Sequence, residues 1–272
     1  MRLRCSSALL LALVFAPGCA TITPQEESLL GAQTHEQLRR EAYLLDDRVV
    51  QGYVGELGRR IAEAGGQGDL DYRFFVVVDD DINAFAAPGG YVYVNTGTIR
   101  RARNVAELAG VLAHEVGHVA RRHIAENVGR RRTVNTARQI GVAAAAVAAG
   151  PAGASAASLL GGLASLAALN SFGRDAEREA DAFAIEVLPE AGYDPDGLVS
   201  FFHTLLRERN EVSSGSFLSD HPATEERIAE TRRMIDAATL PASLRRDDGG
   251  RLEIIQRRIE ILTRAAGPEA PR

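Results

Sequence analysis

Apolar residues recur every three or four positions along much of the chain, a spacing that places them on one face of a helix. Residues 35–65 show this pattern until Gly65-Gly66 ends it, and they are predicted to form an amphipathic helix. The same spacing predicts further helices at residues 104–130, 175–188, 196–208, 223–238 and 252–264. The chain is therefore predicted to be mainly helical.

Between the first two helical stretches the pattern is typical of β-strands. Residues 72–78 are β-branched and aromatic, and residues 84–87 and 91–94 flank the turn sequence Pro-Gly-Gly at 88–90. We expect a small sheet of about three strands. The predicted fold class is α+β, a mainly helical domain with this sheet beside the helix at 104–130.

Length and composition bound the function only loosely. A chain of 272 residues, 46% hydrophobic and 25% charged, is long enough to bury a core in one large domain or two small ones. Its net charge of −5 comes from intermixed acidic and basic residues. Such a balance gives a nucleic-acid partner no electrostatic support.

The first residues have the layout of a secretory signal. Two arginines precede the apolar run at residues 8–15, and small residues follow it. We expect residues 1–18 to be a signal peptide of the lipoprotein type, so that the mature chain begins near Cys19.

Cys19 resembles the lipid acceptor of a bacterial lipobox, although Ala16 and Pro17 depart from the usual residues. Ordinary cleavage after Ala20 is the alternative and would discard Cys19. With a lipid on Cys19, Ala20 resembles the sorting residue of outer-membrane lipoproteins, and the acyl chains would hold the protein to the membrane. The predicted location is the periplasmic face of the bacterial outer membrane.

Residues 140–169 carry no charge. A bilayer can be crossed by about 20 apolar residues, but Gly150-Pro151 divides this stretch and alanine, glycine and serine dominate it. We therefore expect a helical hairpin that is buried, or that faces a membrane or a partner, and membrane spanning is the weaker alternative.

The stretch Leu-Ala-His-Glu-Val-Gly-His, residues 112–118, carries the candidate chemistry. Because a helix advances about 100° per residue, His114 and His118 lie about 40° apart and their imidazoles can converge on one ion. Zinc accepts such nitrogen ligands. Glu115 points to the side where a zinc-bound water would sit, and it can act as the general base for that water.

A solvent-facing His-Glu-His trio is the alternative interpretation. The neighbouring residues are apolar, however, and they indicate a core helix: Leu108, Val111, Leu112, Val116 and Val119. Burying three polar side chains without partners would cost several kcal/mol in total. A metal site is therefore favoured.

The third ligand has to come from elsewhere. Arg121 and Ile124 stand where a metzincin would need glycine and histidine, and His123 is out of register and is expected only to pack. A later helix offers Glu177 and Asp181, four residues apart and so on one face. Glu177 would complete the ligand set, and Asp181 would accept a hydrogen bond from a ligand imidazole. Such a pair alone is common on solvated helices.

The two motifs together resemble the zinc metallopeptidase family that contains the CAAX prenyl endopeptidase and the heat-shock protease HtpX. The stretches "NAFAAPGGYVYVNTGTI" and "SDHPATEERI" extend the resemblance from about Asp46 to Met234. The signal sequence and the lack of spanning helices are similar to its soluble periplasmic BepA/LoiP-like branch. The resemblance implies a zincin-like fold, one zinc ion per chain, Glu177 as the third ligand and Asp181 behind a ligand imidazole.

The domain organisation follows from these boundaries. We expect an N-terminal segment at 19–45, the metallopeptidase domain at 46–240 and a tail with a short helix at 241–272. BepA-like members carry a C-terminal tetratricopeptide domain, and this chain ends too early to hold one, so partner docking of that kind is in doubt.

The same resemblance assigns two more residues. His221 matches a histidine that can approach the zinc and occupy the water position, and Arg227 matches an arginine placed to stabilise the oxyanion. The alternatives are a histidine at a helix start and an arginine on a solvated helix face. His35 and His203 have no acidic companion at ligand spacing and are expected to be structural.

Zinc proteases of this architecture bind a peptide as an extra strand along a sheet edge. The candidate edge here is Asn83, Ala84, Phe85 and Ala86, with a purely structural hairpin as the alternative. The predicted activity is zinc-dependent endopeptidase cleavage of unfolded or misassembled envelope proteins. The alternatives are a lipid-anchored chaperone or assembly factor whose metal is capped by His221, and a scaffold that contacts membranes through residues 140–169.

Overall fold

The computed structural model describes residues 22–67, 70–134, 170–208, 217 and 221–265. The expected signal peptide, Cys19 and the uncharged stretch at 140–169 lie outside these residues. In the described part, no helix combines the length and apolar character that crossing a membrane requires.

The stretch predicted as one helix at 35–65 forms two, so that prediction was wrong in its continuity. Helix α1 covers Pro24–Glu41 and α2 covers Arg48–Ala64. The residues between them are extended beside the sheet, where the Leu45 amide donates to the Val76 carbonyl at 2.8 Å. The Asp47 side chain then accepts from the amides of Val49 and Val50 and caps the start of α2.

Three strands form the sheet, as predicted. They are β1 (Arg73–Val77), β2 (Ala84–Ala87) and β3 (Tyr91–Asn95). The order is β1-β3-β2, with β1 parallel and β2 antiparallel to β3. The turn at Pro88–Gly90 joins β2 to β3, and its two glycines have the positive φ values that favour glycine. Strand β2 is therefore an outer strand of the sheet.

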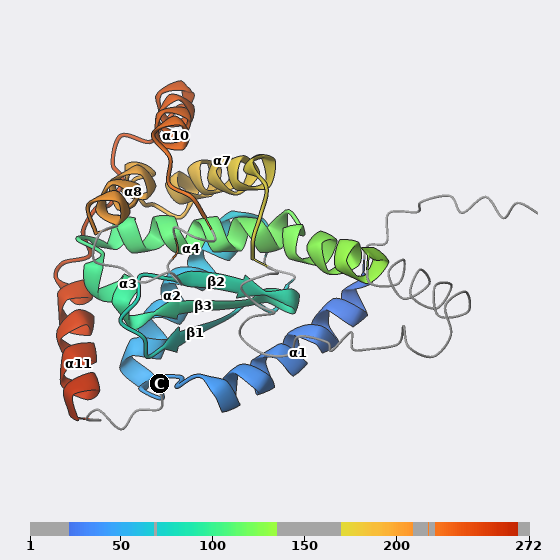
Figure 1. Cartoon of the computed structure of the whole chain (residues 1–272). Helices are drawn as coiled ribbons and strands as arrows, with labels where there is room; N and C mark the ends of the chain where they lie inside the picture. Colours follow the sequence, from blue (N-terminus) through green and yellow to red (C-terminus); the bar gives the residue numbers. More distant parts are fainter. Residues whose placement is uncertain (1–21, 68–69, 135–169, 209–216, 218–220, 266–272) are drawn as a thin grey trace, which may run out of the picture.

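Helix α4 (Val105–Ala120) lies between two layers (Figure 1). One side faces the sheet, and the other packs against α7 (Arg174–Glu190) and α8 (Asp196–Glu208). Gly117 permits the close approach of α7, because a Cβ there would lie 3.1 Å from the backbone of Ala180. The α+β fold with the sheet beside this helix is confirmed.

The helix predicted at 104–130 is also interrupted. Asn104 caps its start, but α4 ends at Ala120 and residues 123–134 form a separate helical run. Arg122 between them has φ +61°, and it is the non-glycine residue with positive φ among the described residues. This break turns His123 back toward α4.

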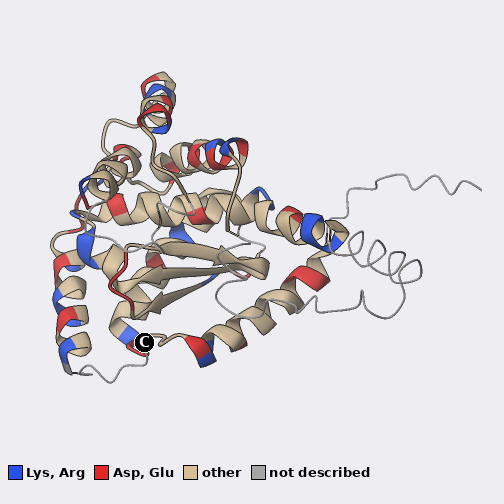
Figure 2. Ribbon diagram, in the orientation of Figure 1, with Lys and Arg blue, Asp and Glu red and all other residues tan. Residues whose placement is uncertain are grey.

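The remaining helices surround this core. They are α3 (Thr96–Arg101), α10 (Glu225–Ala237) and α11 (Arg251–Ala265). Charged residues gather on the outer helices, whereas the sheet and most of α4 carry few (Figure 2). The charges that do occur inside the core therefore need partners there.

Candidate metal centre

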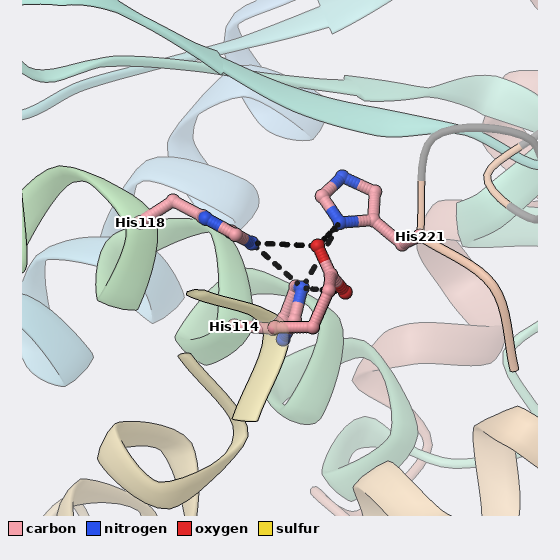
Figure 3. Close-up of side chains that lie close together, drawn as sticks. His114, His118 and His221 are labelled. Atoms are coloured by element: carbon pink, nitrogen blue, oxygen red, sulfur yellow. Dashed lines mark hydrogen bonds and ion pairs between the residues drawn. The ribbon is translucent and has the colours of Figure 1, made fainter. Parts of the chain in front are cut away.

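Four side chains bring one donor atom each to a common point. His114 and His118 come from α4, Glu177 from α7, and His221 from the chain just before α10. Their donor atoms lie within 4.8 Å of one another, and all four residues are buried. Figure 3 shows the three imidazoles pointing toward one another.

The spacing of these donors fits a metal ion. Tetrahedral zinc with bonds of about 2.0–2.1 Å needs ligand atoms about 3.3–3.4 Å apart. His114 Nε2 lies 3.0 Å from His118 Nε2 and 3.2 Å from His221 Nδ1. Glu177 Oε1 lies 3.4 Å from His118 Nε2 and 2.8 Å from His221 Nδ1. The residues present therefore fit a zinc site of nitrogen and oxygen ligands.

The protonation states of Glu177 and His118 also suit a metal. Burial raises the pKa of Glu177, but the three neighbouring imidazoles lower it by more than burial raises it. The pKa of Glu177 therefore lies below the usual value. Burial holds the pKa of His118 well below the usual value. A carboxylate and a neutral imidazole are the forms that bind metals.

His114 is held from behind by a charged network. Its Nδ1 lies 2.9 Å from Asp181 Oδ1, as expected from the sequence, and this contact leaves Nε2 free to face the other donors. Burial lowers the pKa of His114, but the hydrogen bonds with Asp181 and Glu177 outweigh it and raise the pKa. Asp181 in turn accepts from Arg227 Nε at 2.6 Å and Nη2 at 2.7 Å.

Arg227 is buried and contacts two acidic residues of α7, Glu177 and Asp181. Besides its contacts with Asp181, its Nη1 lies 2.7 Å from Glu177 Oε2, and its guanidinium lies over the Phe202 ring. The solvated-arginine alternative is therefore excluded by the burial of this side chain. Contact with a developing oxyanion stays a prediction, because in this structure the guanidinium is engaged by carboxylates.

His118 has a different neighbour behind it, which sequence reasoning missed. His123 Nδ1 lies 3.0 Å from His118 Nδ1, and His123 Nε2 lies 3.3 Å from Glu179 Oε2. His123 was expected only to pack, because it is out of register with the metzincin motif. The left-handed Arg122 directs it toward His118, and no residue type in the stretch signals the break.

Glu115 is buried beside the fourth donor. Its Oε1 lies 3.6 Å from His221 Nε2, on the side of that imidazole away from Nδ1. The His221 ring stacks on Phe217, with 4.6 Å between ring centroids. The position of Glu115 next to the donor cluster suits a general base, and this role stays a prediction.

The other predicted residues lie at the sheet or farther away. Ala84, Phe85 and Ala86 belong to the outer strand β2, and Asn83 directly precedes it. His35 is separate from the donor cluster: its Nδ1 lies 2.9 Å from the Tyr93 hydroxyl oxygen. His203 is exposed on α8.

Two histidines and a glutamate, buried on two helices beside a small sheet, form a donor set typical of metallopeptidases. A model of the peptidase family M48 matches residues 49–235, and the chain belongs to this family. The resemblance to zinc metallopeptidases stated from the sequence is therefore confirmed.

Individual relatives agree with this assignment. The chain is 34% identical over 217 residues to the putative beta-barrel assembly-enhancing protease of Vibrio cholerae, across 78% of this chain and 45% of that protein. It is 33% identical over 169 residues to the metalloprotease YcaL of Escherichia coli, across 61% and 64% of the two chains. It is 29% identical over 187 residues to the mitochondrial metalloendopeptidase OMA1 of Schizosaccharomyces pombe, across 68% and 53%. The chain thus spans about half the length of several curated relatives that it matches.

Proposed function

We propose that the chain is a zinc-dependent endopeptidase that hydrolyses peptide bonds in unfolded or misassembled proteins of the bacterial envelope. The observation that carries the proposal is the convergence of His114, His118 and Glu177 beside the buried Glu115. Two imidazoles and one carboxylate are a donor set that catalytic zinc sites use, with one further position left for water.

The chemistry follows from these residues. When zinc is bound, it lowers the pKa of water toward ~7 and polarises the carbonyl of the scissile bond. Glu115 accepts the proton of the attacking water and transfers it to the departing amine nitrogen. Asp181 fixes the tautomer of His114 by accepting its Nδ1 proton.

His221 makes the described arrangement a latent one. Its Nδ1 takes the place of a fourth ligand, where the water has to sit. The imidazole therefore has to leave before cleavage. We expect His221→Ala to raise the cleavage rate.

The substrate is proposed to lie along β2. This outer strand packs against α4, so a peptide added at residues 83–86 would run close to the donor cluster. Main-chain hydrogen bonds then supply most of the affinity, and side-chain preference is loose. Extended or unfolded polypeptides are the class of substrate that can bind in this way.

The proposed location is the periplasmic face of the outer membrane, with a lipid on Cys19. The signal-like residues 1–18 support export, and several relatives are named as beta-barrel assembly-enhancing proteases. Cys19→Ser is expected to move the protein from the membrane fraction to the soluble fraction.

The central test is Glu115→Gln in purified protein, with casein as an unfolded substrate. Removal of the general base is expected to lower the cleavage rate by about 10²- to 10⁴-fold, while the zinc content stays near one ion per chain. Glu126→Gln, the same exchange at an exposed position, is the control and is expected to cleave normally. Undiminished cleavage by Glu115→Gln would refute the proposal.

One observation favours a second function. Because His221 closes the cluster and every donor is buried, the chain also fits a lipid-anchored chaperone or assembly factor that holds clients without cutting them. Under that function, Glu115→Gln would still correct the envelope defect of a deletion strain. If the chain acts as a protease, Glu115→Gln does not correct that defect.

A further inference from the structure

The two imidazoles of α4 need their outer nitrogens fixed if both are to face one ion. An imidazole that binds metal through Nε2 carries its proton on Nδ1, and a hydrogen-bond acceptor there sets the ring orientation. For His114 that acceptor is Asp181. His118 needs an equivalent acceptor at its own Nδ1.

His123 is the polar partner on that side. Its Nδ1 lies 3.0 Å from His118 Nδ1, and its Nε2 lies 3.3 Å from Glu179 Oε2. One choice of tautomers satisfies both hydrogen bonds: His118 Nδ1 donates to His123 Nδ1, and His123 Nε2 donates to the Glu179 carboxylate. His123 is buried, with 6% of its surface exposed, whereas the Glu179 side chain is 60% exposed.

The backbone is distorted where His123 is brought into place. Arg122 adopts a left-handed conformation, which disfavours residues other than glycine and persists only when surrounding contacts enforce it. The Arg122 side chain contacts the N-terminal part of the chain. Arg122 Nη2 donates to the Ile22 carbonyl at 3.0 Å and lies 3.1 Å from Glu27 Oε2.

From this geometry we propose that His123, backed by Glu179, is a positioning residue that fixes the tautomer and orientation of His118. The inference rests on the proposed zinc site and adds a residue to it. A neutral imidazole thus performs for His118 what the Asp181 carboxylate performs for His114.

The experiment measures Zn²⁺ affinity by competition with a chromophoric chelator, using full-length protein. His123→Ala is expected to weaken zinc binding by about 10- to 100-fold, the usual effect of removing the outer partner of a ligand. His123→Asn is expected to bind nearly as tightly as wild type, because its Oδ1 can occupy the place of Nδ1 and accept the same hydrogen bond. His123→Gln places its polar atoms one bond farther out and should resemble His123→Ala.

Controls separate positioning from packing. Thermal unfolding of each apo variant reports folding, and His203→Asn provides the same exchange at an exposed histidine on α8. If His123→Ala fails to fold, the ratio of the zinc affinities of His123→Asn and His123→Gln tests the proposal instead. A ratio of about 10 or more supports the proposal, and equal affinities overturn it.

The outcomes also distinguish this inference from the proposed function. A wild-type chain that binds no zinc contradicts the proposed function itself. A wild-type chain that binds zinc, with His123→Ala equal to it in affinity, contradicts only the role of His123. Glu179→Ala is expected to have a smaller effect than His123→Ala, because water can replace an exposed carboxylate.

Discussion

The same bidentate arginine–aspartate pair occurs in two regions of the molecule. Behind the metal centre, Arg227 contacts Asp181 at 2.6 and 2.7 Å, and at the start of α2, Arg258 contacts Asp47 through two hydrogen bonds of 2.7 Å. The Asp181 side chain is 2% exposed and Arg227 10%, whereas Asp47 is 12% and Arg258 44% exposed. The two pairs therefore share their hydrogen-bond geometry but differ in how deeply they are buried.

The two aspartates reach the same ionisation by different routes. Burial raises the pKa of Asp181, and the charge of Arg227 outweighs it and lowers the pKa to about 2. The hydrogen bond from Arg258 is the main cause that lowers the pKa of Asp47 to about 2. A lowered pKa thus does not measure how much a pair contributes to stability, because the desolvation that the pair has to offset differs.

The largest expected effect comes from breaking the buried pair. Asp181→Ala leaves the Arg227 guanidinium buried with less compensation and should lower the free energy of unfolding by about 3–5 kcal/mol. It should also weaken zinc binding, because His114 loses its partner. Urea unfolding of the apo protein measures the first effect. Asp175→Ala, at a position 93% exposed on the same helix, is the control and should change stability little.

A double variant sharpens this prediction. Asp181→Leu combined with Arg227→Met removes both charges, and apolar replacements of buried pairs are often tolerated. It should be more stable than Asp181→Ala. A loss below about 1 kcal/mol in Asp181→Ala, the size typical of surface pairs, would remove the distinction between the two regions.

A smaller effect is expected at the more exposed pair of Asp47 and Arg258. Asp47→Ala removes the N-cap of α2 together with the contact to Arg258 and should lower the free energy of unfolding by about 1 kcal/mol. Asp47→Ser keeps a capping oxygen and should retain most of the stability. Urea unfolding is again the measurement, and Asp46→Ala, at the exposed neighbouring position, should be neutral. Equal losses in the Ala and Ser variants would show that the arginine contact dominates.

The smallest effect is the dependence on pH at this site. Because the pKa of Asp47 falls from 3.8 to about 2 on folding, its charge stabilises the fold fully above about pH 5, and this contribution is lost as the pH falls through about 2. Asp47→Asn keeps a good cap and removes the charge together with one of the two hydrogen bonds from Arg258. The difference in unfolding free energy between wild type and this variant should shrink between about pH 5 and about pH 2. A difference that does not change with pH contradicts the prediction.

Those parts of the site that depend on one uninterrupted helix were predictable from the sequence. The spacing of His114 and His118, and that of Glu177 and Asp181, follows from the period of a single helix. Apolar neighbours showed that the first pair is buried. The fourth donor, His221, came from family resemblance, because no periodicity links it to α4.

Features that depend on breaks in regular structure were not predictable. The helix at 35–65 divides because residues 43–45 pair with the end of β1, a contact between distant parts of the chain. The contact of His123 with His118 depends on the left-handed Arg122, and arginine is not a residue type that signals such a conformation. In both cases tertiary contacts override a local pattern that continues through the break.

The contact between Arg122 and Ile22 has a consequence for how far the protease can reach. Ile22 is three residues after Cys19, and three residues extend at most about 11 Å. If Cys19 carries the proposed lipid, only a very short segment separates the bilayer from the contact with Arg122, which directly follows the helix that holds two of the donors. Cleavage would then be confined to polypeptides that stay near the membrane surface. The distance of a polypeptide from the membrane would then select substrates more strongly than its amino-acid sequence.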